Sequence, residues 1–145
     1  MSVEPGRAGA SLSDWLAEQG GADRRGNLIT EVVWDRSRRI ALAEVSRTPA
    51  DHPIVCVALG AGIRAEGLSR VVLACGCRGQ PIAVEVDAAD ALEGARGETP
   101  GSWAERAARN LKAKWRDDIR ASAEYRRAMV PILLRRALQE ILSVS

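Results

Sequence analysis

Four side chains of this sequence could bind a metal ion: His52, Cys56, Cys75 and Cys77. Imidazole and thiolate are ligands that zinc prefers in proteins. If both segments are strands, His52 and Cys56 share one face, as do Cys75 and Cys77, because side chains alternate along a strand. Structural zinc sites usually pair ligands about two to four residues apart, whereas Cys75 and Cys77 are separated by one residue. The alternative is that Cys56 and Cys75 are small core hydrophobes, and no cofactor is predicted.

The same residues permit nucleophilic catalysis by a thiolate, with Cys56 or Cys77 as nucleophile and His52 as base. Such chemistry requires the base within hydrogen-bond reach of the thiol and a third group that orients the base. Asp51 is only the sequence neighbour of His52. A cysteine in the core or in a loop is the competing interpretation.

Two acids, Glu31 and Glu44, lie in β-rich runs with the pattern Glu-Val-Val, ten residues, Glu-Val-Ser46. The pattern resembles the core hairpin of restriction-endonuclease-like nucleases. The resemblance implies that both carboxylates hold a divalent metal for phosphodiester hydrolysis. It covers about 16 residues, and Ser46 stands where the family has a lysine. The alternative is that both glutamates face solvent between buried valines.

Gly60 and Gly62 follow a β-rich run and precede Arg64, so their backbone amides could meet an anion. Neither the dinucleotide spacing nor the Walker spacing of glycines is present. Glycines that relieve a turn are the simpler interpretation.

Basic residues gather in the last third of the chain, where residues 102–145 hold ten bases and five acids. A stripe of arginines can neutralise phosphates, which makes the affinity strongly dependent on salt. The nucleic-acid-binding candidates are Arg126, Arg127, Arg135 and Arg136. Because acids are interspersed, an ordinary mixed-charge helix surface is the alternative.

The composition is that of an ordinary globular domain, with 46% hydrophobic and 28% charged residues in 145. We expect a flexible tail over residues 1–10 and a single domain over residues 11–145. An odd number of cysteines favours reduced thiols and a cytoplasmic protein. No segment approaches the roughly 18 uninterrupted apolar residues that a membrane span requires, so no membrane association is predicted.

The first part of that domain, residues 11–93, is predicted to be a helix followed by a sheet. Ser11 can cap a short N-terminal helix. The β-rich runs that follow are Leu28–Trp34, Ile40–Val45, Ile54–Leu59, Val71–Cys75 and Ile82–Val86. Short links between successive runs predict a mostly antiparallel sheet of four to five strands.

After a loop over residues 94–101, residues 102–145 are predicted to form two amphipathic helices. Ser102 opens the first, in which apolar residues recur every fourth position from Trp103 to Ile119. Ser122 opens the second, with a kink or restart at Pro131. Packing of these helices on the sheet gives an α+β fold.

Apolar residues occur on more than one side of residues 123–144, and surplus apolar area usually marks an interaction site. We therefore predict a non-catalytic interaction or assembly module that docks on a protein partner or on itself through its C-terminal helices. The alternatives are a divergent metal-dependent nuclease that uses Glu31 and Glu44, and nucleic-acid binding through the C-terminal arginines. A single histidine and the lack of a dense titratable cluster weigh against an enzyme.

Overall fold

The computed structural model describes residues 31–33, 36–80 and 82–143. The chain divides into two compact units, Met1–Val33 and Trp34–Ser145. Residues 31–33 are exposed and have no regular secondary structure. The fold below is that of the second unit.

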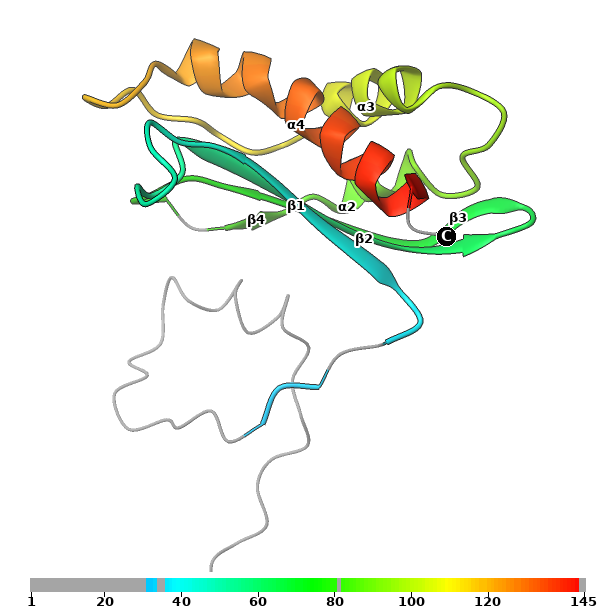
Figure 1. Cartoon of the computed structure of the whole chain (residues 1–145). Helices are drawn as coiled ribbons and strands as arrows, with labels where there is room; N and C mark the ends of the chain where they lie inside the picture. Colours follow the sequence, from blue (N-terminus) through cyan, green and yellow to red (C-terminus); the bar gives the residue numbers. More distant parts are fainter. Residues whose placement is uncertain (1–30, 34–35, 81, 144–145) are drawn as a thin grey trace, which may run out of the picture. The chain divides into compact units, whose positions relative to one another are not determined.

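Four antiparallel strands form one sheet (Figure 1). They are β1 (Arg39–Val45), β2 (Val55–Arg64), β3 (Gly67–Gly76) and β4 (Ala83–Val84), in spatial order β1-β2-β3-β4. Each strand therefore pairs with its neighbour in sequence, as meanders do. The sheet and the helices packed on it confirm the predicted α+β class.

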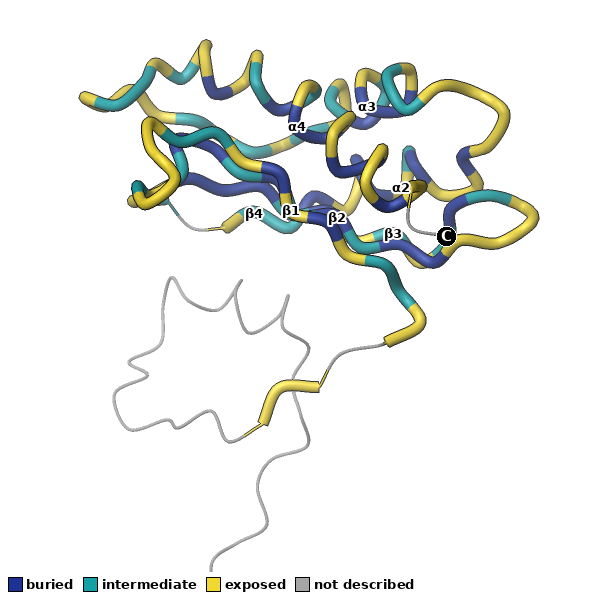
Figure 2. The backbone as a smooth tube through the Cα atoms, in the orientation of Figure 1, coloured by how far each residue is buried: buried dark blue, intermediate teal, exposed yellow. Residues whose placement is uncertain are grey.

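Burial alternates along the strands, as Figure 2 shows for the backbone. In β2, Val55, Val57, Leu59 and Ala61 are fully buried, whereas the residues between them are only partly buried. This period of two turns one face of the sheet toward the core.

Three helices follow within the described residues: α2 (Val86–Asp90), α3 (Pro100–Arg109) and α4 (Ala123–Ser143). The helix α4 packs on β1 and β2, while α3 packs against α4 and α2. Figure 1 shows α3 and α4 on the same side of the sheet. No helix among the described residues is long and apolar enough to cross a membrane.

The helix α4 buries its apolar stripe completely and continues through Pro131 without a break. Spacings of three and four residues place this stripe toward β1 and β2. Its members, each at most 1% exposed, are Val130, Leu133, Leu134, Ala137, Leu138 and Ile141. Most of the apolar area of α4 thus belongs to the core, and the large apolar side chains that the helix leaves exposed, Tyr125, Ile132 and Leu142, are each about two fifths exposed.

The helix expected from Ser102 to Ile119 is much shorter in the structure. Thr99, not Ser102, caps α3, because its Oγ1 accepts a hydrogen bond from the Ser102 amide at 3.2 Å. The helix ends at Arg109, where the Asn110 side chain donates to the carbonyl of Arg106. Residues 111–118 have no helical structure. The second helix begins after Ser122, as predicted, and the Ser122 hydroxyl accepts from the Tyr125 amide.

The first predicted hairpin is also wrong in part. Its second run is β1, but residues 31–33 of its first run are not a strand, and the remaining residues of that run lie outside the described residues. Gly60 and Gly62 do not form a turn, because β2 continues through them with a bulge to Arg64. The tail 1–10 and the helix from Ser11 lie outside the described residues, and the single domain over residues 11–145 stays a prediction.

Candidate functional site

An extended segment over residues 111–118, here called the strap, joins α3 to α4 across the β3–β4 end of the sheet. Side chains from that end bind its backbone. The Glu85 carboxylate, on a residue that is 3% exposed, accepts from the Lys112 amide at 2.7 Å. Gln80 donates to the carbonyl of Lys114 at 2.8 Å and accepts from the Arg116 amide at 3.4 Å. These bonds replace the helical ones that the apolar spacing predicts, so the strap stays extended.

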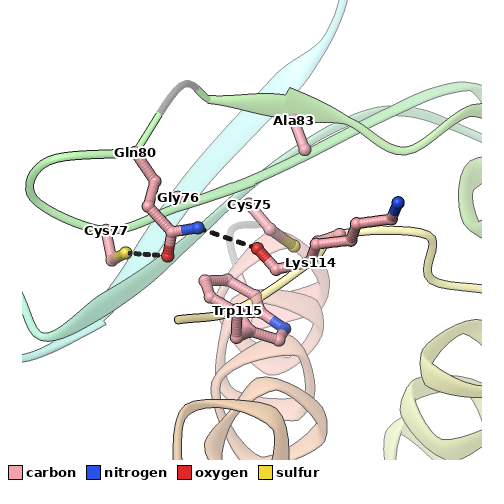
Figure 3. Close-up of a pocket in the computed structure, with 8 residues that line it drawn as sticks. Cys75, Gly76, Cys77, Gln80, Ala83, Lys114 and Trp115 are labelled. Atoms are coloured by element: carbon pink, nitrogen blue, oxygen red, sulfur yellow. Dashed lines mark hydrogen bonds between the residues drawn. The ribbon is translucent and has the colours of Figure 1, made fainter. Parts of the chain in front are cut away.

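Two shallow cavities lie between the strap and the sheet. Figure 3 shows the first, of about 230 Å³, with the Gln80 amide reaching from the β3–β4 turn toward the Lys114 backbone. Its lining residues are Cys75, Gly76, Cys77, Gln80, Ala83, Ala113, Lys114 and Trp115. The second, of about 340 Å³, is bordered by Glu85 and by the Lys112–Asp87 ion pair at 2.5 Å. Hydrogen bonds within the protein engage the Glu85 and Gln80 side chains, and the thiols of Cys75 and Cys77 line the first cavity.

The three cysteines are free thiols, and their surroundings suppress ionisation. Burial raises the pKa of Cys75 to about 12. Burial is also the largest cause of the raised pKa of Cys56 and Cys77. Because only the thiolate is strongly nucleophilic, these thiols are poorly suited to covalent catalysis near neutral pH.

The same burial predicts an order of thiol reactivity. Cys56 lies on the face of the sheet that no described helix covers and is partly exposed, whereas Cys75 and Cys77 are buried. Iodoacetamide should therefore modify Cys56 first in the folded chain, at a rate that rises with pH beyond pH 9, since its pKa is raised above 9.0. Peptide mass spectrometry after timed alkylation measures this order. Equal rates for all three thiols in folded protein would contradict it.

Arg126 is a buried cation that ties three segments together. It is 1% exposed, and its Nε donates to the carbonyl of Ile54 at 3.1 Å. Its Nη2 pairs with Asp118 at 2.7 Å, and its Nη1 donates to the carbonyl of Arg116. A guanidinium enclosed in this way holds the end of the strap and cannot meet a phosphate.

The Asp118 carboxyl is predicted to make stability depend on acidic pH. Its hydrogen bond from Arg126 is the main cause that lowers its pKa from 3.8 to about 2. A pKa lower in the folded than in the unfolded chain stabilises the fold above about pH 4, and this contribution is lost as the pH falls toward 2. Urea unfolding of wild type and Asp118→Asn should therefore differ most near neutral pH and converge toward pH 2. A constant difference over that range would contradict the assignment.

The structure does not bring the predicted metal ligands together as a site. His52 is exposed in the β1–β2 loop, where Arg120 binds its carbonyl and pairs with Asp51 at 3.0 Å. Cys56 and Cys75 lie on opposite faces of neighbouring strands, because Val57 is the partner of Cys75. Within residues 31–33, 36–80 and 82–143, no group of three or more histidine, cysteine or acidic side chains is placed to hold a metal ion.

The remaining candidates are scattered. Glu44 is exposed in β1, and Glu31 lies in residues 31–33, which form no strand, so the paired strands that the nuclease hypothesis requires are missing from the described residues. Arg127, Arg135 and Arg136 are exposed on α4, whereas Arg126 is buried.

Glu85 and Gln80, the side chains that position the strap, are not among the residues predicted from the sequence. One sequence feature could have indicated the role of Glu85, because it is an acid inside the apolar run from Ile82 to Val86. A buried carboxylate needs hydrogen-bond donors, and the nearest donors come from a segment 27 residues later. No local pattern shows that pairing.

Comparison with known proteins identifies a family that matches most of the described fold. A protein-family model described as the CO dehydrogenase flavoprotein C-terminal domain matches residues 40–141. No curated protein matches the chain.

Solved structures of redox enzymes share the fold at low sequence identity. Carbon monoxide dehydrogenase from Hydrogenophaga pseudoflava has a chain that is 19% identical, with a TM-score of 0.62, over 76% of this chain and 38% of that one. Quinoline 2-oxidoreductase from Pseudomonas putida 86 has a chain that is 21% identical, with a TM-score of 0.61, over 72% of this chain and 37% of that one. Reconstituted CO dehydrogenase from Oligotropha carboxidovorans has a chain that is 18% identical, with a TM-score of 0.64, over 78% of this chain and 40% of that one. The chain thus spans about two fifths of the length of these solved chains.

The family match overturns the functions predicted from the sequence. The matched domain is part of a redox flavoprotein, not an assembly module that docks through its C-terminal helices, a nuclease or a nucleic-acid-binding protein. Three features of the structure explain the difference: the apolar stripe of α4 lies in the core, Glu31 is not in a strand, and Arg126 is buried.

Proposed function

Because the chain belongs to the CO dehydrogenase flavoprotein C-terminal domain family, we propose that it is the accessory domain of a flavin-dependent redox enzyme. In this proposal it packs beside a flavin-binding portion that the described residues do not contain. The observation that carries the proposal is the family match over residues 40–141, which includes every strand and helix of the described fold except the ends of β1 and α4. A protein partner, or a further portion of the same polypeptide, follows from it.

The described residues do not fit a flavin dinucleotide by themselves. Ligand pockets for small molecules measure about 300–1,000 Å³, and a dinucleotide needs the upper part of that range. The two cavities found here measure about 230 and 340 Å³ and are open and shallow. Dinucleotide sites also place the pyrophosphate at a glycine-rich turn that opens a helix. Gly60 and Gly62, the glycines that came nearest to such a turn in the sequence, lie inside a strand.

Two preparations test the proposal. The full chain, purified alone and titrated with FAD, should show no stoichiometric binding by flavin fluorescence. A tagged copy expressed at its native level in the source organism should be recovered with flavin, seen by its visible absorption and bleached by a chemical reductant. A native preparation without flavin would overturn the proposal, and so would equimolar FAD binding by the isolated chain. The cytoplasmic location stays a prediction.

A further inference from the structure

The face of the sheet that no described helix covers is apolar where a solvated sheet face is polar. Antiparallel sheets with one face in water usually alternate apolar and polar residues along each strand. Here the outward positions of the strands are apolar as well. We call this surface the open face, and its residues are Ile40, Leu42, Ala58, Val72, Ala74 and Val84.

Strand register makes the open face continuous. Leu42 is the partner of Ala58, Ala58 of Ala74 and Ala74 of Val84, so one apolar row crosses all four strands. A second row joins Ile40 to Val72 across Gly60. Cross-strand partners on one face lie in contact distance, so the first row is continuous, whereas Gly60 leaves a gap between Ile40 and Val72 in the second.

The side chains of the open face differ in size in an ordered way. Ile40 and Leu42 of β1, which are 64% and 59% exposed, have the small residues Gly60 and Ala58 of β2 as their partners. Large side chains on the edge strand thus stand beside a low central strand. Such relief suits apolar side chains from another surface, which would rest over β2 and bury Ile40 and Leu42.

Charge begins at the margin of the open face. In the row next to Leu42, the exposed carboxylate of Glu44 is the partner of Cys56. An apolar centre with a charged side chain such as Glu44 at its edge is typical of a protein interface.

We propose that the open face is the docking surface for the flavin-binding portion of the enzyme, through an uncharged apolar surface of that portion. This inference rests on the proposed function. The solved chains with this fold extend far beyond it, since this chain covers 37% to 40% of them. Ile40 and Leu42, the two large side chains of the open face, lie on β1, the first strand of the matched domain. The match begins at residue 40 itself, which places the boundary of the domain beside the open face.

Cys56 provides a reporter for this surface. It is the position before Ala58 on the same face of β2, pairs with Glu44 of β1, is partly exposed, and its Sγ donates to the carbonyl of Gly76 at 3.4 Å. Alkylation of Cys56 by iodoacetamide, read by mass spectrometry, should be about 100-fold slower in the native flavin-containing preparation than in the isolated full chain.

Two substitutions separate docking from folding. Leu42→Asp places a carboxylate in the open face and should restore fast labelling of Cys56 in the native preparation. Ile119→Asp makes the same chemical change at a 97% exposed side chain in the loop before α4, and should leave Cys56 protected. Both isolated variants should melt at the wild-type temperature, because neither side chain is buried.

Each other outcome has a distinct meaning. Flavin in the native preparation with Cys56 labelled as fast as in the isolated chain would overturn this inference and leave the proposed function standing. Protection of Cys56 in the isolated chain would overturn it too, in favour of the chain's own residues if the mass is monomeric and of a second copy if the mass is dimeric. A native preparation that lacks flavin would overturn the proposed function, and the docking inference with it.

Discussion

Replacing Arg126 with methionine is expected to lower the free energy of unfolding by about 3 to 5 kcal/mol. Methionine keeps the alkyl stem but removes a buried guanidinium that binds Ile54, Arg116 and Asp118. Removal of one partner of a buried ion pair typically costs that much, because the other groups lose their bonds without regaining full hydration. Urea unfolding followed by circular dichroism measures the change.

Arg127→Met is the matched control for this prediction. Arg127 is the next residue in α4 and is exposed, so its replacement should change the unfolding free energy by less than about 0.5 kcal/mol. A loss below about 1 kcal/mol for Arg126→Met would mean that the guanidinium does not hold the strap in place.

Replacing Gly67 with alanine is expected to destabilise the fold by about 2 to 4 kcal/mol. Gly67 begins β3 with φ of +121°, a conformation that side chains disfavour. A Cβ there would also lie 2.7 Å from the carbonyl oxygens of Gly94 and Ala95. Those carbonyls belong to a segment that pairs with Leu68, so the chain cannot easily move aside. Thermal and urea unfolding of the variant measure the cost.

Gly79→Ala separates backbone strain from steric overlap. Gly79 also has a positive φ, +77°, but nothing lies within 4 Å of the position of its Cβ. It should therefore cost only about 1 kcal/mol, the strain alone. Equal costs at both glycines would show that the contact with residues 94 and 95 does not constrain the hairpin.

The sequence predicts well the elements whose signal is local. Alternation of apolar residues identifies the runs that became β1 and β2, and Ser122 marks the start of α4 by its capping position. Strand ends were less clear: β2 continues through Gly60 and Gly62 to Arg64, because pairing with β3 outweighs the local preference of glycine for turns.

The strap could not be predicted because its causes are distant in the chain. Leu111 and Trp115 continue the helical spacing of α3 and pack against the core, yet Glu85 and Gln80 capture the backbone of the residues between them. Arg126 likewise carries the same local signal as Arg127, and only the fold decides which of the two is buried. Tertiary hydrogen bonds of this kind override helix propensity.

The function predicted from the sequence is wrong because that prediction assigns the apolar residues of α4 to an interaction surface, whereas most of them lie in the core. The apolar stripe of α4 packs against β1 and β2, while Ile40 and Leu42 on the other side of the sheet remain exposed. The runs on β1 and β2 are apolar at both parities, a pattern typical of strands covered on two faces. The sequence alone therefore contains an indication that the second face of the sheet is also covered.

The proposed role as an accessory domain of a flavin enzyme is tested by the molar ratio of flavin to this chain in the native preparation, measured before and after the tagged chain is separated from its partners. We predict a ratio close to equimolar before separation and no flavin on the separated chain. Absence of flavin at the start, or flavin that stays with the separated chain, would contradict this role.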